Sequence, residues 1–356
     1  MTEDRDPVRI GPLQTDCYVY EGDGTRPIVE ENLRIYYDAD EPVHVPEDVR
    51  RWRQEIEEEQ ATRAVAGADR RWNHPRFAVE TIAVTRSDDV EDPIVEIRFS
   101  PADYFTFLAA QQLDRRMEEG EGAGFTLREH YLAGKDPVAV NGFLSSSFGA
   151  NVAVVTGRDN RMLFSRRSPT VGGNAGNWNS SANEGLSGKH DLKDGVPDLF
   201  GAARRALREE LAVHQSDACE LELLSFGMDV GRHQWAAFFL AVLPDLSEAD
   251  LRDRWSRGVD DKWEHTEFRF VEAEPDAVLD FLLDPAHRDE WTACGPALFF
   301  HAIVRLMVRR LGDAGEGRLA VERAIGPAIR RAEAKADPAA GPSGRGGSGD
   351  SGSDGP

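Results

Sequence analysis

The hydrophobic and polar positions follow two different periods in separate stretches of the chain. Alternation with period two and short apolar runs predict strands over residues 33–37, 76–86, 93–99, 151–167 (two strands around a turn), 221–230, 234–243 and 267–271. Apolar residues at helical spacing predict helices over residues 46–65, 100–117, 202–213, 275–283, 296–311 and 318–334. This order predicts an α/β fold, with an α/β/α sandwich built on a mixed sheet.

Capping residues support two further assignments of helix starts. Ser100, Pro101 and Asp103 combine an N-cap residue, a proline at the first helical position and an acid in the first turn. They predict a helix that begins at Ser100. Ser247 and Asp250 have the spacing of a capping box, which predicts a short helix after Ser247.

Composition changes along the chain and predicts its division into parts. Residues 1–145 contain predicted strands and helices without a known motif, so we expect an N-terminal accessory α+β region. Residues 146–312 form the predicted main domain, and residues 313–336 form a C-terminal helix. Residues 337–356 are mostly Gly, Ser, Pro, Asp and Ala. Such a segment cannot bury enough apolar surface to fold, which predicts a disordered tail.

Charge and missing sequence signals narrow the function classes. The 356-residue chain has a formal net charge of −22 and no basic stripe with interleaved aromatic residues, which argues against a nucleic-acid partner. It has no apolar run of transmembrane length, and its N-terminus lacks the order of a signal peptide. We therefore expect a cytoplasmic protein without a membrane partner. Cys17, Cys219 and Cys294 are isolated, which predicts neither a zinc site nor a disulfide.

One predicted helix combines an apolar stripe with paired acids. Residues 202–213 read AARRALREELAV, in which Glu209 and Glu210 lie off the stripe. Arg205 lies one turn before Glu209, within reach of an i,i+4 ion pair. Upstream of this helix are the strand-turn-strand unit 151–167, Trp178 and the loop NEGLSG over residues 183–188. Strand, strand, glycine loop and acidic helix is the order in which a site for a divalent metal and a diphosphate is commonly assembled.

Together these segments resemble the Nudix hydrolase family, whose pattern is G-x5-E-x7-R-E-U-x-E-E-x-G-U, where U is a bulky aliphatic residue. The second half of the pattern matches at Arg205, Leu207, Glu209, Glu210 and Val213. Ala206 stands where the family has glutamate, and Ala212 where it has glycine. In the first half, Gly185 is the best match for the glycine and is followed by an expanded loop. The resemblance implies a Nudix-like domain over residues 146–312 that cleaves a nucleoside diphosphate derivative or a related pyrophosphate.

The family's chemistry implies a role for these residues. Mg²⁺ (or Mn²⁺) would be held by Glu209, Glu210 and the loop at Gly185, because Mg²⁺ takes oxygen ligands and can activate a water molecule. Arg205 would orient the glutamates. Alanine at position 206 cannot replace the family's glutamate, so Glu184 or Glu264 would act as the base. The implied partner is a small nucleotide or other diphosphate ligand. Paired domains are frequent in the family, so the resemblance permits a homodimer and leaves the oligomeric state open.

Other polar positions have two interpretations each. Arg166 and Arg167 end the second strand of the unit 151–167, where a guanidinium group can bind a phosphate; salt bridges to surface acids are the alternative. The loop around His190 and Asp191 either reaches over the pocket and selects the ligand or is a surface insertion. His233 lies at a predicted hairpin turn, where a solvent-exposed side chain is favoured over a substrate contact.

The motif also permits functions other than hydrolysis. A sequence of the form R-x-L-x-E-E-L occurs on many surface helices, where the glutamates form only a solvated face. A Nudix-like sensor or regulatory protein, which binds a nucleotide with weak or no cleavage, is favoured by Ala206, Ala212 and the altered first half of the pattern. The hydrolase and the sensor differ in whether the bound ligand is recovered intact.

Overall fold

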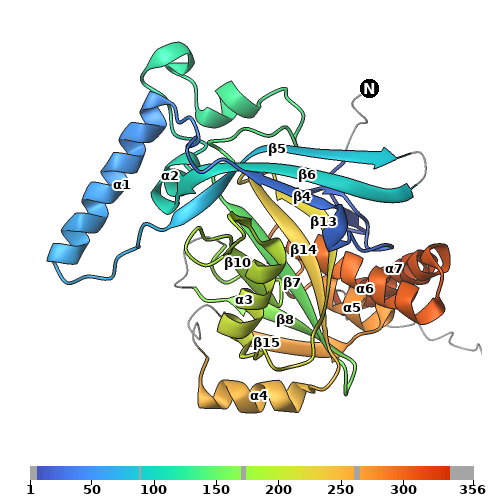
Figure 1. The fold of residues 1–356 in the computed structure, drawn as a ribbon. Helices are drawn as coiled ribbons and strands as arrows, with labels where there is room; N and C mark the ends of the chain where they lie inside the picture. Colours follow the sequence, from blue (N-terminus) through green and yellow to red (C-terminus); the bar gives the residue numbers. More distant parts are fainter. Residues whose placement is uncertain (1–5, 88–89, 170–173, 260–264, 337–356) are drawn as a thin grey trace, which may run out of the picture.

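The computed structural model describes residues 6–87, 90–169, 174–259 and 265–336, and its centre is a mixed β-sheet (Figure 1). Six strands follow one another in the order β15 (His265–Glu272), β8 (Arg161–Arg167), β7 (Phe148–Thr156), β14 (Gln234–Leu243), β13 (Glu220–Asp229) and β3 (Cys17–Glu21). The short strands β9 (Trp178–Asn179) and β10 (Ala182–Gly185) pair with β8 and β7. β7 and β14 are parallel, whereas the neighbouring pairs are antiparallel. The mixed α/β architecture expected from the sequence is confirmed.

Both faces of the central strands are buried, which explains their long apolar runs. On β7, Ala150 and Val152 face one apolar cluster, whereas Ala153 and Val155 face another. Successive side chains of a strand point to opposite faces, so a strand that is covered on both sides is apolar at nearly every position. Residues 235–243 of β14 have this composition for the same reason.

Different elements cover the two faces of the sheet. Helix α3 (Leu199–Leu211) packs on one face beside a three-stranded sheet of β4 (Leu33–Tyr37), β6 (Val90–Asp103) and β5 (Pro75–Ser87). Helices α5 (Pro275–Leu282), α6 (Gly295–Leu311) and α7 (Ala314–Ala336) cover the other face (Figure 1). Helix α4 (Glu248–Arg257) opens with the predicted capping box of Ser247 and Asp250, which is confirmed.

The N-terminal region shares its core with the rest of the molecule. Its strand β3 is an edge of the main sheet, and Phe77 and Phe99 belong to the same apolar cluster as α3. Helices α1 (Glu47–Val65) and α2 (Tyr104–Ala110) instead pack around Trp52 in a cluster of their own. The division of the chain between residues 145 and 146 stays a prediction. In the structure, residues from both sides of this boundary belong to the same apolar cluster.

The remaining elements are short. They are the hairpins of β1 (Arg9–Ile10) with β2 (Leu13–Gln14) and of β11 (Leu192–Lys193) with β12 (Val196–Pro197), and the helical turns η1 (Glu30–Asn32), η2 (Gly120–Gly122) and η3 (Arg128–Leu132). The predicted disordered tail, residues 337–356, lies outside the described residues. The cysteines are free thiols, and Cys17 and Cys294 are buried. Among the described helices, none is long and apolar enough to cross a membrane.

One predicted helix begins later than its sequence signal and is shorter. Ser100 pairs with Ala78 in the ladder between β5 and β6, so the strand continues through the predicted helix start. The N-cap is Asp103, whose carboxylate accepts a hydrogen bond from the Thr106 N–H at 2.7 Å. The prediction of a helix over residues 100–117 was wrong at both ends, since α2 spans Tyr104–Ala110. The helix starts later because the hydrogen bonds of the β5–β6 ladder outweigh one favourable capping sequence.

Candidate functional site

Helix α3 has well-defined ends, which determine where its acidic side chains point. Asp198 is the N-cap, and its carboxylate accepts a hydrogen bond from the Gly201 N–H at 2.8 Å. At the other end Ala212 lies in the left-handed region with φ 55°. The N–H of Ala212 donates to the carbonyl of Arg208 at 3.1 Å, which is the αL motif of a helix C-terminus, and the N–H of Val213 donates to the carbonyl of Leu207. Glycine is the usual residue at this left-handed position, and Ala212 adopts the same conformation without it.

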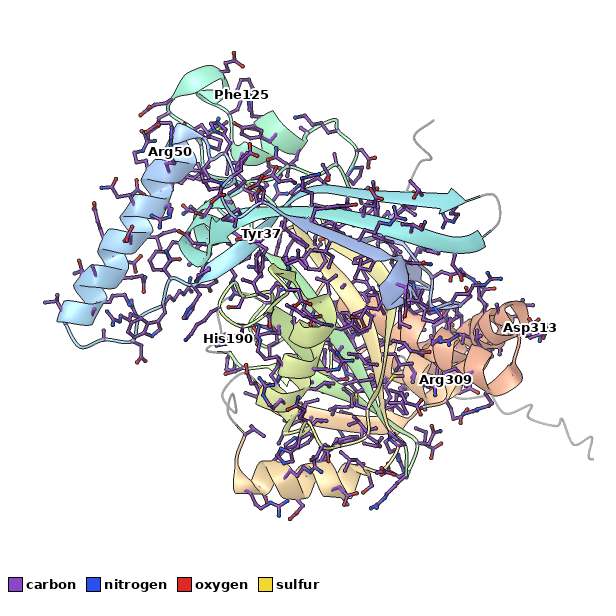
Figure 2. The ribbon with its side chains drawn as sticks, viewed as in Figure 1. Tyr37, Arg50, Phe125, His190, Arg309 and Asp313 are labelled. Atoms are coloured by element: carbon purple, nitrogen blue, oxygen red, sulfur yellow. The ribbon has the colours of Figure 1, made fainter. Side chains whose placement is uncertain are left out.

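Arg205, on the buried side of α3, is held by an acid from the expanded loop. Its Nε donates to Asp191 Oδ1 at 2.9 Å, and its Nη2 donates to Asp191 Oδ2 at 2.7 Å. Both side chains are nearly inaccessible. The loop around His190 and Asp191 lies beside α3 (Figure 2). Asp191 therefore anchors this loop to the helix, a role that its local sequence did not reveal.

Two predicted site residues meet on the same guanidinium nitrogen. Arg205 Nη1 lies 2.8 Å from Glu184 Oε2 and 3.2 Å from Glu209 Oε2, so the predicted i,i+4 pair is present. Arg205 Nη2 also donates to the Gly185 carbonyl at 3.1 Å. Burial alone would lower the pKa of Arg205, but the Asp191 hydrogen bonds and the charges of Glu184, Asp191 and Glu209 raise it. The structure thus brings Glu184, Gly185, Arg205 and Glu209 together.

Glu210 points away from this group. It is fully buried; its Oε1 accepts a hydrogen bond from the Asn183 N–H at 2.9 Å, and its Oε2 lies 2.6 Å from His265 Nε2. Adjacent residues of a helix are about 100° apart around its axis, so Glu209 and Glu210 face different neighbours. Glu264, the other predicted base, lies outside the described residues.

A second arginine reaches the glycine loop from the N-terminal region. Arg76, on β5, donates from Nη1 to the carbonyls of Gly185 at 2.7 Å and Leu186 at 3.2 Å. Its Nε is buried and has no hydrogen-bond partner among the described residues. Burial lowers the pKa of Arg76, an effect that the charge of Glu184 opposes. Sequence analysis missed this residue, because nothing near Arg76 in the chain links it to a loop more than a hundred residues away.

The predicted metal ligands are all engaged by groups of the protein. The Gly185 carbonyl accepts from two arginines, and Glu209 contacts Arg205 and Arg208. Glu210 is occupied by the Asn183 N–H and His265. Across the described part of the chain, no group of three His, Cys, Asp or Glu side chains is arranged to hold a metal ion. A divalent cation does not fit these residues in the arrangement that they adopt.

Ala206 belongs to the core and not to the site. It has no exposed surface and lies in the apolar cluster with Ala202, Ala203 and Leu207. At the position where the family pattern has a glutamate, this chain therefore packs a methyl group against the sheet.

A cavity opens beside Arg76, and only one of the two arginines predicted to bind phosphate, Arg167, lines it. Its volume is about 200 Å³, and its lining includes Arg76, Gly185, Asn183 and Arg167. Arg166 is directed elsewhere: its Nε donates to the Gly176 carbonyl at 2.8 Å, and its Nη2 pairs with Glu290 at 2.5 Å. Successive side chains of β8 alternate between faces, which is why only Arg167 lines this cavity.

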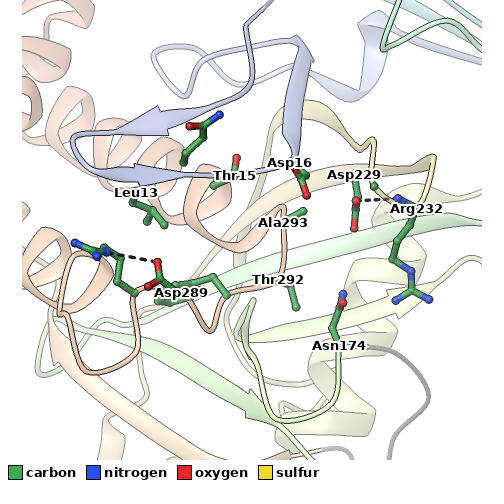
Figure 3. A pocket seen from close by; sticks show the side chains of 13 residues that line it. Leu13, Thr15, Asp16, Asn174, Asp229, Arg232, Asp289, Thr292 and Ala293 are labelled. Atoms are coloured by element: carbon green, nitrogen blue, oxygen red, sulfur yellow. Dashed lines mark hydrogen bonds and ion pairs between the residues drawn. The ribbon is translucent and has the colours of Figure 1, made fainter. Parts of the chain in front are cut away.

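An adjoining cavity of about 590 Å³ shares lining residues with the first, among them Asp229, Arg232 and Thr292 (Figure 3). Asp16 also lines this second part. Burial raises the pKa of Asp229, although the Arg232 N–H donates to its Oδ1 at 3.1 Å. The combined cleft therefore contains both guanidinium and carboxyl groups: Asp229 and Arg232 line both parts, and Asp16 lines the second.

His233 is buried, contrary to the solvent-exposed position favoured from its place in a turn. Its exposed fraction is 1%, and burial together with the charge of Arg128 lowers its pKa to about 4. The turn is covered by the N-terminal region, where Arg128 Nη2 donates to the carbonyl of Gly231 at 3.2 Å. Trp178 and Trp235 are also buried.

Comparisons with known proteins give weak similarities only. No protein-family model matches the sequence, and no curated protein matches it. Similar solved structures include DR0079 from Deinococcus radiodurans, at 16% identity and a TM-score of 0.29, covering 56% of this chain and 97% of that one. Tm1382, described as a candidate Nudix hydrolase, has 16% identity and a TM-score of 0.28, covering 45% of this chain and 70% of that one. The E. coli dihydroneopterin triphosphate pyrophosphohydrolase has 12% identity and a TM-score of 0.25, covering 44% of this chain and 94% of that one.

The structural neighbours thus include Nudix hydrolases. At TM-scores of 0.25–0.29 this likeness says nothing about the arrangement of the site residues.

Proposed function

We propose that this chain is a Nudix-like protein that binds a small phosphorylated ligand, a nucleotide or another diphosphate, in the cleft beside Gly185. One observation carries the proposal: Arg76, Arg167 and Arg232 line a single cavity. Guanidinium groups bind phosphate oxygens through paired hydrogen bonds, which makes such a cavity suited to an anionic ligand. The chain as a whole has a net charge of −22, so three arginines around one cavity differ from the overall charge of the protein.

The other groups of the cleft support a nucleotide rather than a simple anion. Asn151, Asn179 and Asn183 line the same cavity and offer both amide donors and amide acceptors. Asp229, which lines both cavities, and Asp16, which lines the adjoining one, offer acceptors for the amino or hydroxyl groups of a base or sugar. A ligand that carries both phosphates and hydrogen-bond donors matches these groups.

A second candidate function is hydrolysis of the same ligand with Mg²⁺ or Mn²⁺. It is favoured by the convergence of Glu184 and Glu209, whose carboxylates lie within 3.2 Å of one nitrogen atom of Arg205. In that case at least one arginine would have to leave the Gly185 carbonyl before a metal could bind there. The homodimer that the resemblance permits stays a prediction.

The test is a thermal-shift screen of nucleotides and dinucleotides, each with Mg²⁺ and with a chelator, followed by chromatography of every stabilising ligand. We expect a ligand that raises the melting temperature in chelator and is recovered unchanged. Recovery of two phosphorylated fragments in Mg²⁺ alone would instead establish the hydrolase. No stabilisation by any phosphorylated ligand, in either condition, would contradict both functions.

A further inference from the structure

The carbonyl oxygen of Gly185 marks the place where the Nudix resemblance puts a metal ion. In the structure this oxygen accepts hydrogen bonds from Arg76 Nη1 at 2.7 Å and from Arg205 Nη2 at 3.1 Å. A carbonyl oxygen has two lone pairs, and two charged donors use both. The cationic partners of this oxygen are therefore guanidinium groups of the chain itself.

The absence of a side chain at Gly185 makes room for the guanidinium group of Arg76. A Cβ atom on this residue would lie 2.5 Å from Arg76 Nη1 and 3.2 Å from its Cζ. The shorter of these distances is below real Cβ contacts, so a side chain at position 185 would displace the guanidinium end of Arg76 from its present place. The glycine that the sequence matched to the family's metal-binding loop is thus also the residue that admits a guanidinium group.

The charges around the loop balance without a metal ion. Three carboxylates, those of Glu184, Asp191 and Glu209, lie among the guanidinium groups of Arg76, Arg205 and Arg208. Buried charges need partners of opposite sign, and here each carboxylate has one from the protein.

Arg76 also has capacity left for a ligand. Its guanidinium group lies 5.5 Å from the centre of the Tyr104 ring and lines the 200 Å³ cavity. Its Nε is a buried donor with no acceptor in the described part of the chain. A buried donor without a partner is costly, and an anionic ligand in the cavity would relieve that cost.

We propose that Arg76 takes the place of the divalent cation beside Gly185 and supplies the fixed positive charge that a bound diphosphate meets. The strand that provides it, β5, belongs to the N-terminal region, so this assigns that region a part in the site. The second half of the proposal rests on the proposed function, because it requires a diphosphate ligand. The first half, exclusion of the metal, does not.

The experiment has one arm for each half. Binding of Mn²⁺ alone is followed by the decrease of the free Mn²⁺ signal in electron paramagnetic resonance, for the wild type, R76A and R166A. R166A is the control, since Arg166 pairs with Glu290 and is not among the residues that line the cavity. We expect no binding by the wild type or R166A at millimolar Mn²⁺, and binding of one ion by R76A, because this variant frees the lone pair of the Gly185 carbonyl that Arg76 uses, while Arg205 keeps the other. Equal Mn²⁺ binding by the wild type and R76A would overturn the exclusion of the metal.

The second arm measures inorganic pyrophosphate by calorimetry in the presence of a chelator. We expect binding by the wild type and R166A and at least tenfold weaker binding by R76A. Undiminished affinity in R76A would overturn the role of Arg76 towards the ligand. If no phosphorylated compound binds to the wild type, the proposed function fails, while the Mn²⁺ arm still decides whether Arg76 excludes the metal. Should R76A lack the wild-type circular dichroism spectrum, R76M, which keeps an unbranched apolar side chain without the guanidinium group, replaces it in both arms.

Discussion

The Nη1 atom of Arg76 lies 2.7 Å from the carbonyl oxygen of Gly185, although the two residues are 109 positions apart in the chain. This contact joins the three-stranded N-terminal sheet to the loop that precedes helix α3. It also places a guanidinium group where the family resemblance implies a metal. The N-terminal region is therefore structurally part of the site.

The two neighbouring arginines of β8 provide a matched pair for ligand binding. We expect R167A to weaken binding of the stabilising nucleotide about tenfold, which corresponds to ~1.4 kcal/mol, because its guanidinium group lines the cavity. R166A should leave the affinity within about twofold, since Arg166 pairs with Glu290. Calorimetric titration of both variants checks this, and an equal loss in the two would show that the cavity is not the binding site.

Asp191 is expected to be necessary for stability, because it neutralises the buried Arg205. D191N should lower the free energy of unfolding by about 2 kcal/mol, because it weakens two charged hydrogen bonds of Arg205 while Glu184 and Glu209 remain beside the guanidinium group. D194N is the control, since Asp194 is an exposed residue of the same loop with a positive φ that asparagine tolerates. Urea denaturation of both variants measures the difference. Similar stabilities would mean that Arg205 does not depend on Asp191.

The left-handed residue at the end of α3 predicts a stabilising substitution. A212G should raise the free energy of unfolding by about 0.5–1 kcal/mol, because an alanine at φ 55° is strained and a glycine is not. The same change at Ala203, in the middle of the helix and fully buried, should lower it by about 1 kcal/mol. Thermal and urea unfolding compare the two. If A212G destabilised the protein as A203G does, residue 212 would not adopt the left-handed conformation in solution.

Ala206 tests whether the family's missing glutamate can be restored. A206E would place a carboxylate in an apolar cluster, so we expect a loss of stability of about 3 kcal/mol or more and no gain of Mg²⁺-dependent cleavage. A206Q has the same size without the charge and separates crowding from charge burial. A stable A206E variant that cleaves the bound nucleotide would show that this position faces a working metal site.

Stability should fall with decreasing pH partly through His301. Burial lowers its pKa to about 4, and its Nδ1 lies 2.8 Å from Ser225 Oγ. Between pH 6.5 and pH 4 the unfolded chain binds a proton at this histidine that the folded chain does not, so stability is present above this window and is lost within it. In urea unfolding between pH 7.5 and pH 4.5, the free energy of unfolding should fall less steeply for H301Q than for the wild type. The difference between the two slopes should reach up to ~1.4 kcal/mol per pH unit. The exposed-site variant H214Q should follow the wild type, and equal slopes for all three would contradict the assignment.

Much of the local structure followed from the sequence because its causes are local. The period of the apolar residues placed the hairpin of β7 and β8, the strands β13 and β14 and the helices α1 and α3, and one capping box placed the start of α4. The pairing of Arg205 with Glu209 followed from their spacing of one turn. In each case the partners lie within a few residues of each other, so the pattern itself contains the interaction.

Only the tertiary structure decided what surrounds those residues. Arg76 reaches Gly185 through sheet packing, Asp191 reaches Arg205 from a loop without a periodic pattern, and the neighbouring acids Glu209 and Glu210 meet different partners because the helix packs against the sheet on one side. Burial and charge pairing between distant segments have no local signature. The sequence by itself therefore determined which acids and arginines are available on α3 and its loop. The packing of the N-terminal sheet decided that guanidinium groups occupy the place where a metal was expected.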